Sequence, residues 1–180
     1  MWREKLREAL ADWASVIMLT LTVDPSDYEG PEDAYRKIGK QRRVAETIKK
    51  LHAREAIKSR RFTQTLEFHK SGWPHWHVLV ESTFVDKHLL QRLWDRGHCW
   101  VSKHDFMSVD HAINYATKYI VKTSEEEPFW FPDWVLDYSG NIRRFSTSRG
   151  LCPTRKLKKP KHDAKPRIRI RKTARMRSEQ

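Results

Sequence analysis

Two histidines and one glutamate are the residues of this chain that are best spaced for chemistry. His75 and His77 stand two positions apart, so on a strand both imidazoles point to the same face of a sheet. Glu67 belongs to the preceding alternating run, 62–69, and residues 70–73 have the composition of a turn. A hairpin would therefore place Glu67 beside both histidines. One carboxylate and two imidazoles on one surface can bind a divalent metal ion.

We call Glu67, His75 and His77 the carboxylate–imidazole cluster. A His-x-His pair alone is more typical of two partly exposed strand histidines than of metal ligands. The same sheet face would also carry several threonines, and a polar sheet face is usually one that simply meets water. The alternative is that this face is a functional site, which requires further reactive side chains from the rest of the chain.

A predicted helix at 108–122 supplies a second group of reactive side chains. Tyr115, Lys118, Tyr119 and Lys122 follow i, i+3, i+4 and i+7 spacing, so two hydroxyls and two ammonium groups share one helix face. The apolar residues of this segment form a separate stripe that would be buried. Alone, such a polar face is more typical of a solvent-facing surface with amphipathic tyrosines.

Phosphate chemistry would suit both groups together, if this helix lies over the sheet face that carries the cluster. A bound metal polarises a phosphodiester, and a tyrosine oxygen that attacks phosphorus forms a covalent phosphotyrosine. A phenol has a pKa of about 10, so it needs nearby positive charge, which Lys118 and Lys122 would provide. Among metals that accept this donor set, Mg²⁺ or Mn²⁺ fits phosphate handling best.

Strands and helices that position these groups follow from the apolar pattern. Strands are predicted at 15–23, 61–69, 74–81, 98–102 and 141–145, and helices at 2–13, 31–58, 86–96 and 108–122. Trp76 falls on the opposite, apolar face of the hairpin and would anchor the two histidines to the core. Helices 31–58 and 86–96 can cover that face, with Gly97 as the C-terminal cap of the latter. The fold class is therefore α+β, a central antiparallel sheet of about five strands with helices packed on it.

Composition bounds the class of protein. A chain of 180 residues is long enough for one domain with a substantial core. Two well-separated cysteines fit a reduced intracellular protein and argue against a disulfide scaffold or a structural zinc site. No apolar run reaches the roughly 20 residues that span a bilayer, so we expect neither a membrane partner nor a secretory signal. The aromatic segment 128–138 would pack on the core or on a partner, or else stack on bases.

Positive charge is concentrated at the C-terminal end. The net charge is +13, of which residues 155–180 carry +10 and the rest only +3. We therefore expect a domain at 1–150 and a basic, disordered tail at 151–180 that binds nucleic acid through counterion release. A merely solubilising tail is the alternative. The tail residues expected to contact nucleic acid are Arg155, Lys156, Lys158, Lys159, Lys161, Arg167, Arg169, Arg171 and Lys172.

Three segments together resemble a known family. His75-Trp76-His77 resembles the His-hydrophobic-His motif of the HUH endonucleases, and residues 115–122 resemble the two-tyrosine motif of rolling-circle replication initiators from single-stranded DNA phages and plasmids. Residues 18–23 are similar to the threonine-containing first motif of these initiators. The order matches that of the family, and the resemblance spans residues 15–122.

The resemblance implies an enzyme that nicks and rejoins one strand of a single-stranded or hairpin origin. It would hold the 5′ end on tyrosine and leave a 3′ hydroxyl as a primer for a polymerase. The implied fold is an antiparallel sheet similar to RNA-recognition domains. The chain has no Gly-x-x-x-x-Gly-Lys-Ser/Thr loop, so a host helicase would have to unwind the DNA. The protein would act in the cytoplasm of a bacterial host, in association with DNA.

The family's functional positions carry over residue by residue. His75 and His77 match the metal ligands, with Mg²⁺ or Mn²⁺ as the ion. Glu67 stands where the third ligand is expected, and His69 shares its face and is the rival. Tyr115 and Tyr119 match the family's nucleophiles. Lys118 and Lys122 match its phosphate-contacting lysines.

Other functions remain open at this level. A two-tyrosine transposase or a mobilisation relaxase would use the same chemistry. A non-catalytic single-stranded nucleic-acid binder is a reading of a different class, but it would show stacking aromatics on the sheet face where this chain has Thr, Glu and His. The oligomeric state is not indicated by the sequence.

Overall fold

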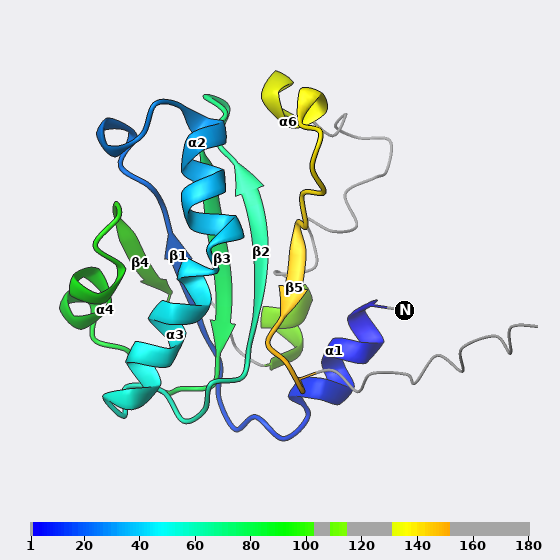
Figure 1. The fold of residues 1–180 in the computed structure, drawn as a ribbon. Helices are drawn as coiled ribbons and strands as arrows, with labels where there is room; N and C mark the ends of the chain where they lie inside the picture. Colours follow the sequence, from blue (N-terminus) through cyan, green and yellow to red (C-terminus); the bar gives the residue numbers. More distant parts are fainter. Residues whose placement is uncertain (1, 103–108, 115–130, 152–180) are drawn as a thin grey trace, which may run out of the picture.

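Five antiparallel strands form the centre of the molecule, and helices cover both faces of the sheet (Figure 1). The computed structural model describes residues 2–102, 109–114 and 131–151. The elements in chain order are α1 (Trp2–Leu10), β1 (Ile17–Leu21), the 3-10 turn η1 (Pro25–Asp27), α2 (Pro31–Tyr35), the π-helical turn η2 (Arg36–Lys40), α3 (Arg43–Ala53), β2 (Phe62–Phe68), β3 (Pro74–Val80), α4 (Lys87–Trp94), β4 (Cys99–Ser102), a short helix at 109–114, α6 (Asp133–Asp137) and β5 (Phe145–Thr147). The predicted α+β class and five-stranded antiparallel sheet are confirmed.

β3 lies at the centre of the sheet, whose strand order is β4-β1-β3-β2-β5. The predicted β2–β3 hairpin is confirmed, and its register sets Glu67 opposite His75. His77 has Thr65 opposite it on β2 and Thr20 opposite it on β1. All five residues have the same parity in the pleat, so their side chains share one face of the sheet.

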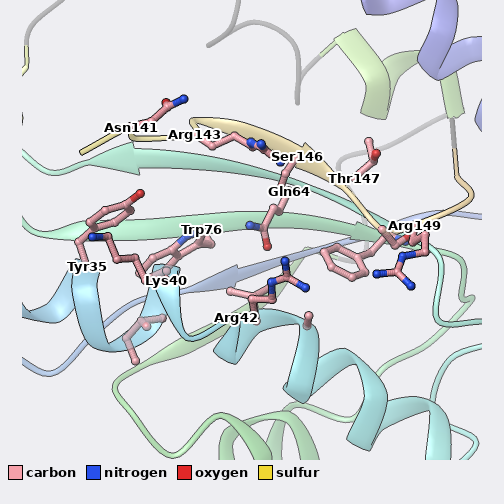
Figure 2. Close-up of a pocket in the computed structure, with 16 residues that line it drawn as sticks. Tyr35, Lys40, Arg42, Gln64, Trp76, Asn141, Arg143, Ser146, Thr147 and Arg149 are labelled. Atoms are coloured by element: carbon pink, nitrogen blue, oxygen red, sulfur yellow. The ribbon is translucent and has the colours of Figure 1, made fainter. Parts of the chain in front are cut away.

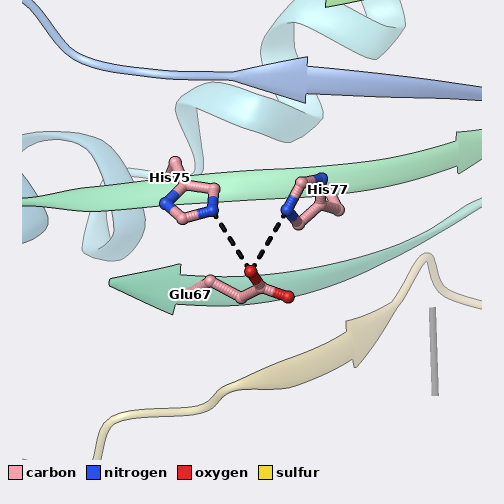
Figure 3. Close-up of side chains that lie close together, drawn as sticks. All are labelled: Glu67, His75 and His77. Atoms are coloured by element: carbon pink, nitrogen blue, oxygen red, sulfur yellow. Dashed lines mark hydrogen bonds and ion pairs between the residues drawn. The ribbon is translucent and has the colours of Figure 1, made fainter. Parts of the chain in front are cut away.

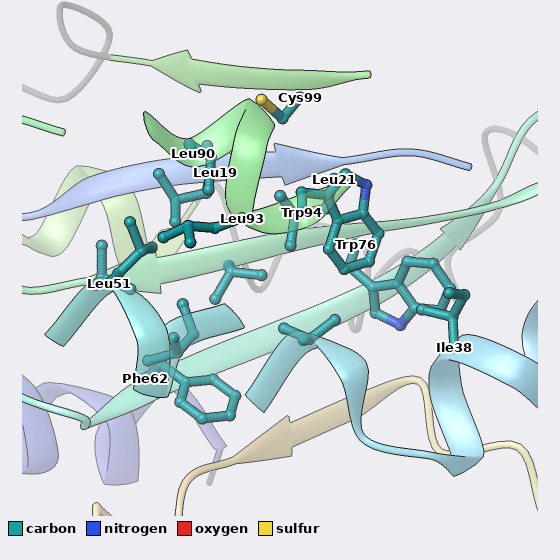
Figure 4. Packing of buried hydrophobic residues seen from close by; sticks show 14 of the residues in the cluster. Leu19, Leu21, Ile38, Leu51, Phe62, Trp76, Leu90, Leu93, Trp94 and Cys99 are labelled. Carbon is teal, nitrogen blue, oxygen red and sulfur yellow. The ribbon is translucent and has the colours of Figure 1, made fainter. Parts of the chain in front are cut away.

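The opposite face carries the main core. Trp76 is only 1% exposed there and meets Trp94 of α4 edge to face, with ring centroids 6.2 Å apart (Figure 4). Leu51 of α3 and Leu90 of α4 are fully buried in the same cluster. The expectation that these helices cover the apolar face, with Trp76 anchored among them, is confirmed.

A second, smaller core lies on the face that carries the carboxylate–imidazole cluster. Met18 of β1 and Leu79 of β3 project from this face, and Leu6 and Leu10 of α1 pack on them. Ala112 and Ile113 of the 109–114 helix join the same small core. This face was expected to be polar, but the end around Met18 and Leu79 is buried and apolar. The end that carries the histidines remains polar.

The prediction of one continuous helix over 31–58 is wrong. The chain instead forms α2, widens into η2, and breaks at Arg42, whose φ of 57° lies in the left-handed region. A Cβ at Gly39 would lie 2.8 Å from the Tyr35 ring, so glycine lets this aromatic ring fold back against the widened turn. Period-3.6 patterning continues through such a break and does not reveal it.

Two further boundaries differ from the predictions. The left-handed residue that ends α4 is Asp95, at φ 46°, and not Gly97. Gly97 is required for a different reason, because a Cβ there would lie 2.5 Å from the carbonyl carbon of Val23. The last strand is Phe145–Thr147 rather than 141–145, since pairing with β2 begins only where Phe145 meets Thr65.

The described part of the aromatic segment, 131–138, packs on the protein itself. Trp134 donates its indole N–H to the carbonyl of Gly72 at 3.1 Å and contacts the rings of Tyr35 and Phe68. Of the alternatives expected for this segment, packing on the protein's own core is confirmed for Trp134. None of the helices in the described residues is long and apolar enough to span a membrane.

Candidate functional site

A tight β2–β3 turn fixes the position of the carboxylate–imidazole cluster. The His69 N–H donates to the Trp73 carbonyl at 2.9 Å, and the Gly72 N–H donates to the His69 carbonyl at 2.7 Å. Gly72 has a φ of +86°, which a side chain would strain. Because the turn is this short, Glu67 and His75 become direct cross-strand neighbours.

The three side chains converge on one point (Figure 3). Oε2 of Glu67 lies 3.2 Å from Nε2 of His75 and 3.3 Å from Nε2 of His77. The donor atoms of the three residues all lie within 4.8 Å of one another. The His75 and His77 rings stand nearly perpendicular, at 87°, so each presents one nitrogen to the shared carboxylate oxygen.

Neighbouring side chains orient both imidazoles. Nδ1 of His77 lies 3.0 Å from the hydroxyl oxygen of Thr20, and this contact directs Nε2 toward Glu67. His75 stacks on His69, with ring centroids 4.3 Å apart. His69 itself does not belong to the three-residue donor group, and its ring lies on the exposed end of the hairpin. In the sequence Thr20 is one of several threonines expected on this face, and its orienting role follows only from its cross-strand pairing with His77.

Electrostatics in the cluster favour an ionised Glu67. Burial by itself would raise the pKa of this carboxyl, but hydrogen bonds from His75 and His77 outweigh burial and lower the pKa to about 2. Burial also lowers the pKa of His69, and the nearby His75 adds to that effect. Glu67 is therefore a carboxylate throughout the physiological range, ready to bind a cation.

The donor set is compatible with a divalent ion. Oε1 of Glu67 and Nδ1 of His75 are buried without a hydrogen-bond partner among the described residues, which is costly for a carboxylate oxygen. Ligands of Mg²⁺ lie about 2.1 Å from the ion, so two ligands at right angles are about 3 Å apart. The separations of 3.2 and 3.3 Å between donor atoms match that edge. Glu67, His75 and His77 could thus hold one ion and leave further positions open.

The 109–114 helix covers the same sheet face. Ala112 is fully buried and Ile113 is 1% exposed in the small core beside Met18 and Leu79. The buried stripe predicted for this helix is confirmed over these residues. The chain therefore runs over the sheet face that carries the cluster just before it reaches Tyr115 in the sequence.

The remaining predicted site residues lie outside the described part of the chain. These are the nucleophile and phosphate-contact candidates Tyr115, Lys118, Tyr119 and Lys122, and the tail candidates Arg155, Lys156, Lys158, Lys159, Lys161, Arg167, Arg169, Arg171 and Lys172. Of the predicted site residues, the structure brings together Glu67, His75 and His77.

One basic residue near the cluster was not expected. Arg144 precedes β5 and is close enough to Glu67 for their charges to interact, while burial lowers the pKa of its guanidinium. Its Cζ also lies 5.4 Å from the centre of the Phe131 ring. No motif marks Arg144 in the sequence, because its position depends on the pairing of β5 with β2.

Comparison with known proteins matches this chain to one protein family. Residues 16–124, more than half of the chain, match the family model of the replication-associated protein ORF2. The match includes β1, the β2–β3 hairpin and the 109–114 helix. No curated protein and no solved structure shows significant similarity to the chain.

Proposed function

This chain belongs to the replication-associated protein ORF2 family, and we propose that it is a replication initiator that nicks and rejoins single-stranded DNA at an origin. Within that proposal it is a metal-dependent HUH endonuclease of the two-tyrosine type. The observation that carries the proposal is the convergence of Glu67, His75 and His77 on the sheet face that the 109–114 helix also covers. The chain leads from that helix directly into the two-tyrosine segment.

Glu67, His75 and His77 would hold Mg²⁺ or Mn²⁺, which supplies charge to polarise the scissile phosphodiester. Thr20 keeps the His77 ring in its orientation through the contact with Nδ1. Arg144 adds a positive charge on the same side as Glu67, where negative charge develops on the phosphate oxygens.

Tyr115 or Tyr119 is the proposed nucleophile. Its phenolic oxygen forms a bond to phosphorus as the bond from phosphorus to the 3′ oxygen breaks. The phenolic proton is transferred, through solvent, to the departing 3′ oxygen. Lys118 and Lys122 would stabilise the phenolate and the phosphate during this exchange. Because one phosphodiester replaces another without hydrolysis, a 3′ hydroxyl can attack the phosphotyrosine, release the phenol and rejoin the strand. The second tyrosine would serve the strand transfer that ends or restarts a round.

The rest of the proposal concerns organisation and partners. Residues 1–150 would form the catalytic domain, and residues 151–180 a basic arm that strengthens binding to origin DNA. The free 3′ hydroxyl would serve a host polymerase, and a host helicase would separate the strands. The setting would be the cytoplasm of a bacterial host.

A covalent-capture experiment tests the proposal. The full chain is mixed with labelled single-stranded DNA hairpins of randomised flanking sequence and Mn²⁺, and adducts that survive denaturant are isolated and sequenced. We expect an adduct from the native protein, and none from Tyr115→Phe/Tyr119→Phe or from His75→Ala. His88→Ala is the matched control, because His88 is exposed on α4. An adduct that survives the double tyrosine substitution contradicts the proposal.

A further inference from the structure

A hollow of about 570 Å³ lies on the far side of the sheet from the carboxylate–imidazole cluster, between η2–α3 and the segment around β5 (Figure 2). Gln64 of β2 and Trp76 of β3 form part of its floor, and both have the opposite parity to Glu67 and His77 in the pleat. Its volume falls within the range of known ligand sites. This groove is therefore separate from the cluster.

Four cationic residues line the groove: Lys40, Arg42, Arg143 and Arg149. All four side chains are exposed, and among the described residues no aspartate or glutamate lines the groove with them. Four like charges around one hollow repel one another, and they attract anions more strongly than isolated surface charges do.

Three cations close to the groove are paired with carboxylates, in contrast to the four that line it. Arg36 pairs with Glu32, Lys37 pairs with Asp33 at 2.8 Å, and Arg43 pairs with Glu46 at 2.9 Å. Lys40, Arg42, Arg143 and Arg149 form no ion pair with any described residue. Lys40 lies over the Tyr138 ring, at 5.0 Å from its centre. The charges that line the hollow are thus ones that no described carboxylate neutralises.

Hydrogen-bonding groups complete the lining. Gln64 and Asn141 offer side-chain amides, and Ser146 and Ser148 offer hydroxyls. Amides and hydroxyls bind phosphate and sugar oxygens as well as the edges of unpaired bases. The aromatic residues that line the groove, Tyr35, Phe62 and Trp76, are all buried, so they offer no exposed ring on which bases could stack. The groove is therefore suited to a phosphate backbone more than to an isolated base.

The edge strand β5 connects the two faces. Arg143 lines the groove, whereas the next residue, Arg144, interacts with Glu67 on the other face. Among the described strands, β5 pairs only with β2 and forms the edge of the sheet. A flexible single strand of DNA can therefore pass around this edge from one face to the other. We propose that the groove formed by Lys40, Arg42, Arg143 and Arg149 binds the phosphate backbone of single-stranded DNA, on the face opposite the carboxylate–imidazole cluster. The choice of DNA as the ligand rests on the proposed function, whereas the existence of the groove does not.

Matched charge substitutions in the full chain test this inference. Binding of a labelled oligo-dT of 20 nucleotides is measured in EDTA, so that cleavage plays no part. Arg42→Gln/Arg149→Gln removes two unpaired groove charges, and Arg36→Gln/Lys37→Gln removes two paired charges outside the groove. We expect the groove pair to bind about tenfold more weakly than the control pair at low salt. The salt slope should also fall by about 1.4 for the groove pair, because each lost contact to a single strand removes about 0.7.

The outcomes separate the possible failures. The proposal that the groove binds DNA is overturned if the two double variants have equal affinities and equal salt slopes while both retain the native thermal unfolding midpoint. Displacement of the oligonucleotide by micromolar AMP would identify a mononucleotide pocket and also overturn a strand-binding groove. A selective loss of binding in the groove pair, together with no adduct in the covalent-capture experiment, would leave the groove standing and reject the nicking mechanism.

Discussion

Thr20 and His77 face each other across β1 and β3, with 3.0 Å between the threonine hydroxyl oxygen and Nδ1 of the imidazole. This contact directs the other ring nitrogen toward Glu67, from which it lies 3.3 Å away. The position of one candidate ligand thus depends on a residue on a different strand.

Substitution of Thr20 should therefore weaken metal binding without removing a ligand. We expect Thr20→Val to lower Mn²⁺ affinity about 10–100-fold, the usual cost of losing a group that orients a ligand, as measured by titration calorimetry. Thr20→Ser keeps the hydroxyl and should bind nearly as well as the native protein. Equal affinities for the valine and serine variants would contradict the orienting role.

Glu67 should make the metal-free protein sensitive to acid. Its pKa falls from 4.5 in the unfolded chain to about 2 in the folded protein, so its stabilising contribution is complete above pH 4.5 and is lost as pH falls through 2. The full contribution is on the order of 3 kcal/mol. Urea unfolding in EDTA at pH 5 and pH 3 should show a larger loss for the native protein than for Glu67→Gln. Parallel losses in both proteins would refute this.

Gly97 and Gly30 provide a matched pair for the fold. Gly97→Ala would place a Cβ 2.5 Å from the Val23 carbonyl carbon and 2.6 Å from the Asp24 nitrogen, both in backbone that cannot move cheaply. We expect a loss of roughly 2–4 kcal/mol in the free energy of unfolding. Gly30→Ala meets no atom within 4 Å and should change stability by about 0.5 kcal/mol or less.

Trp94 links α4 to the end of β1. Its indole N–H donates to the Thr22 carbonyl at 2.6 Å, and its ring is fully buried. Trp94→Phe should cost about 2–4 kcal/mol, since it leaves a carbonyl unpaired and a partly filled cavity. Trp100→Phe is the control, because Trp100 is 63% exposed. Chemical denaturation that shows equal losses for both variants would disprove the packing argument.

Local pattern accounts for most of the sheet and for the proximity of the three candidate ligands. The alternation in β2 and β3 and the short turn at Gly72 suffice to place Glu67 beside His75, because only neighbouring segments are involved. The break at Arg42 and the second core around Leu79 could not be inferred in this way. Both depend on contacts between elements distant in the sequence, which periodicity does not encode.

The cationic groove illustrates the same limit. Arg42 and Arg149 come together only when β5 joins the edge of the sheet, and nothing in their local sequence marks them as partners. That no described carboxylate pairs with them is likewise a property of side-chain packing. A net charge of +13 indicates an anionic partner but not where on the domain it would bind.

The β2–β3 hairpin also bears on the order in which the molecule assembles. Glu67, His75 and His77 are close in sequence, so bringing them together closes only a short loop and costs little chain entropy. The groove instead requires residues near 40 to meet residues near 149, and β5, which helps to form it, is three residues long and paired to one described neighbour. A local opening that releases β5 would dismantle the groove while the hairpin stays intact. The groove can thus be lost while the carboxylate–imidazole cluster remains, but loss of the hairpin would remove both, because β2 and β3 form part of the groove floor.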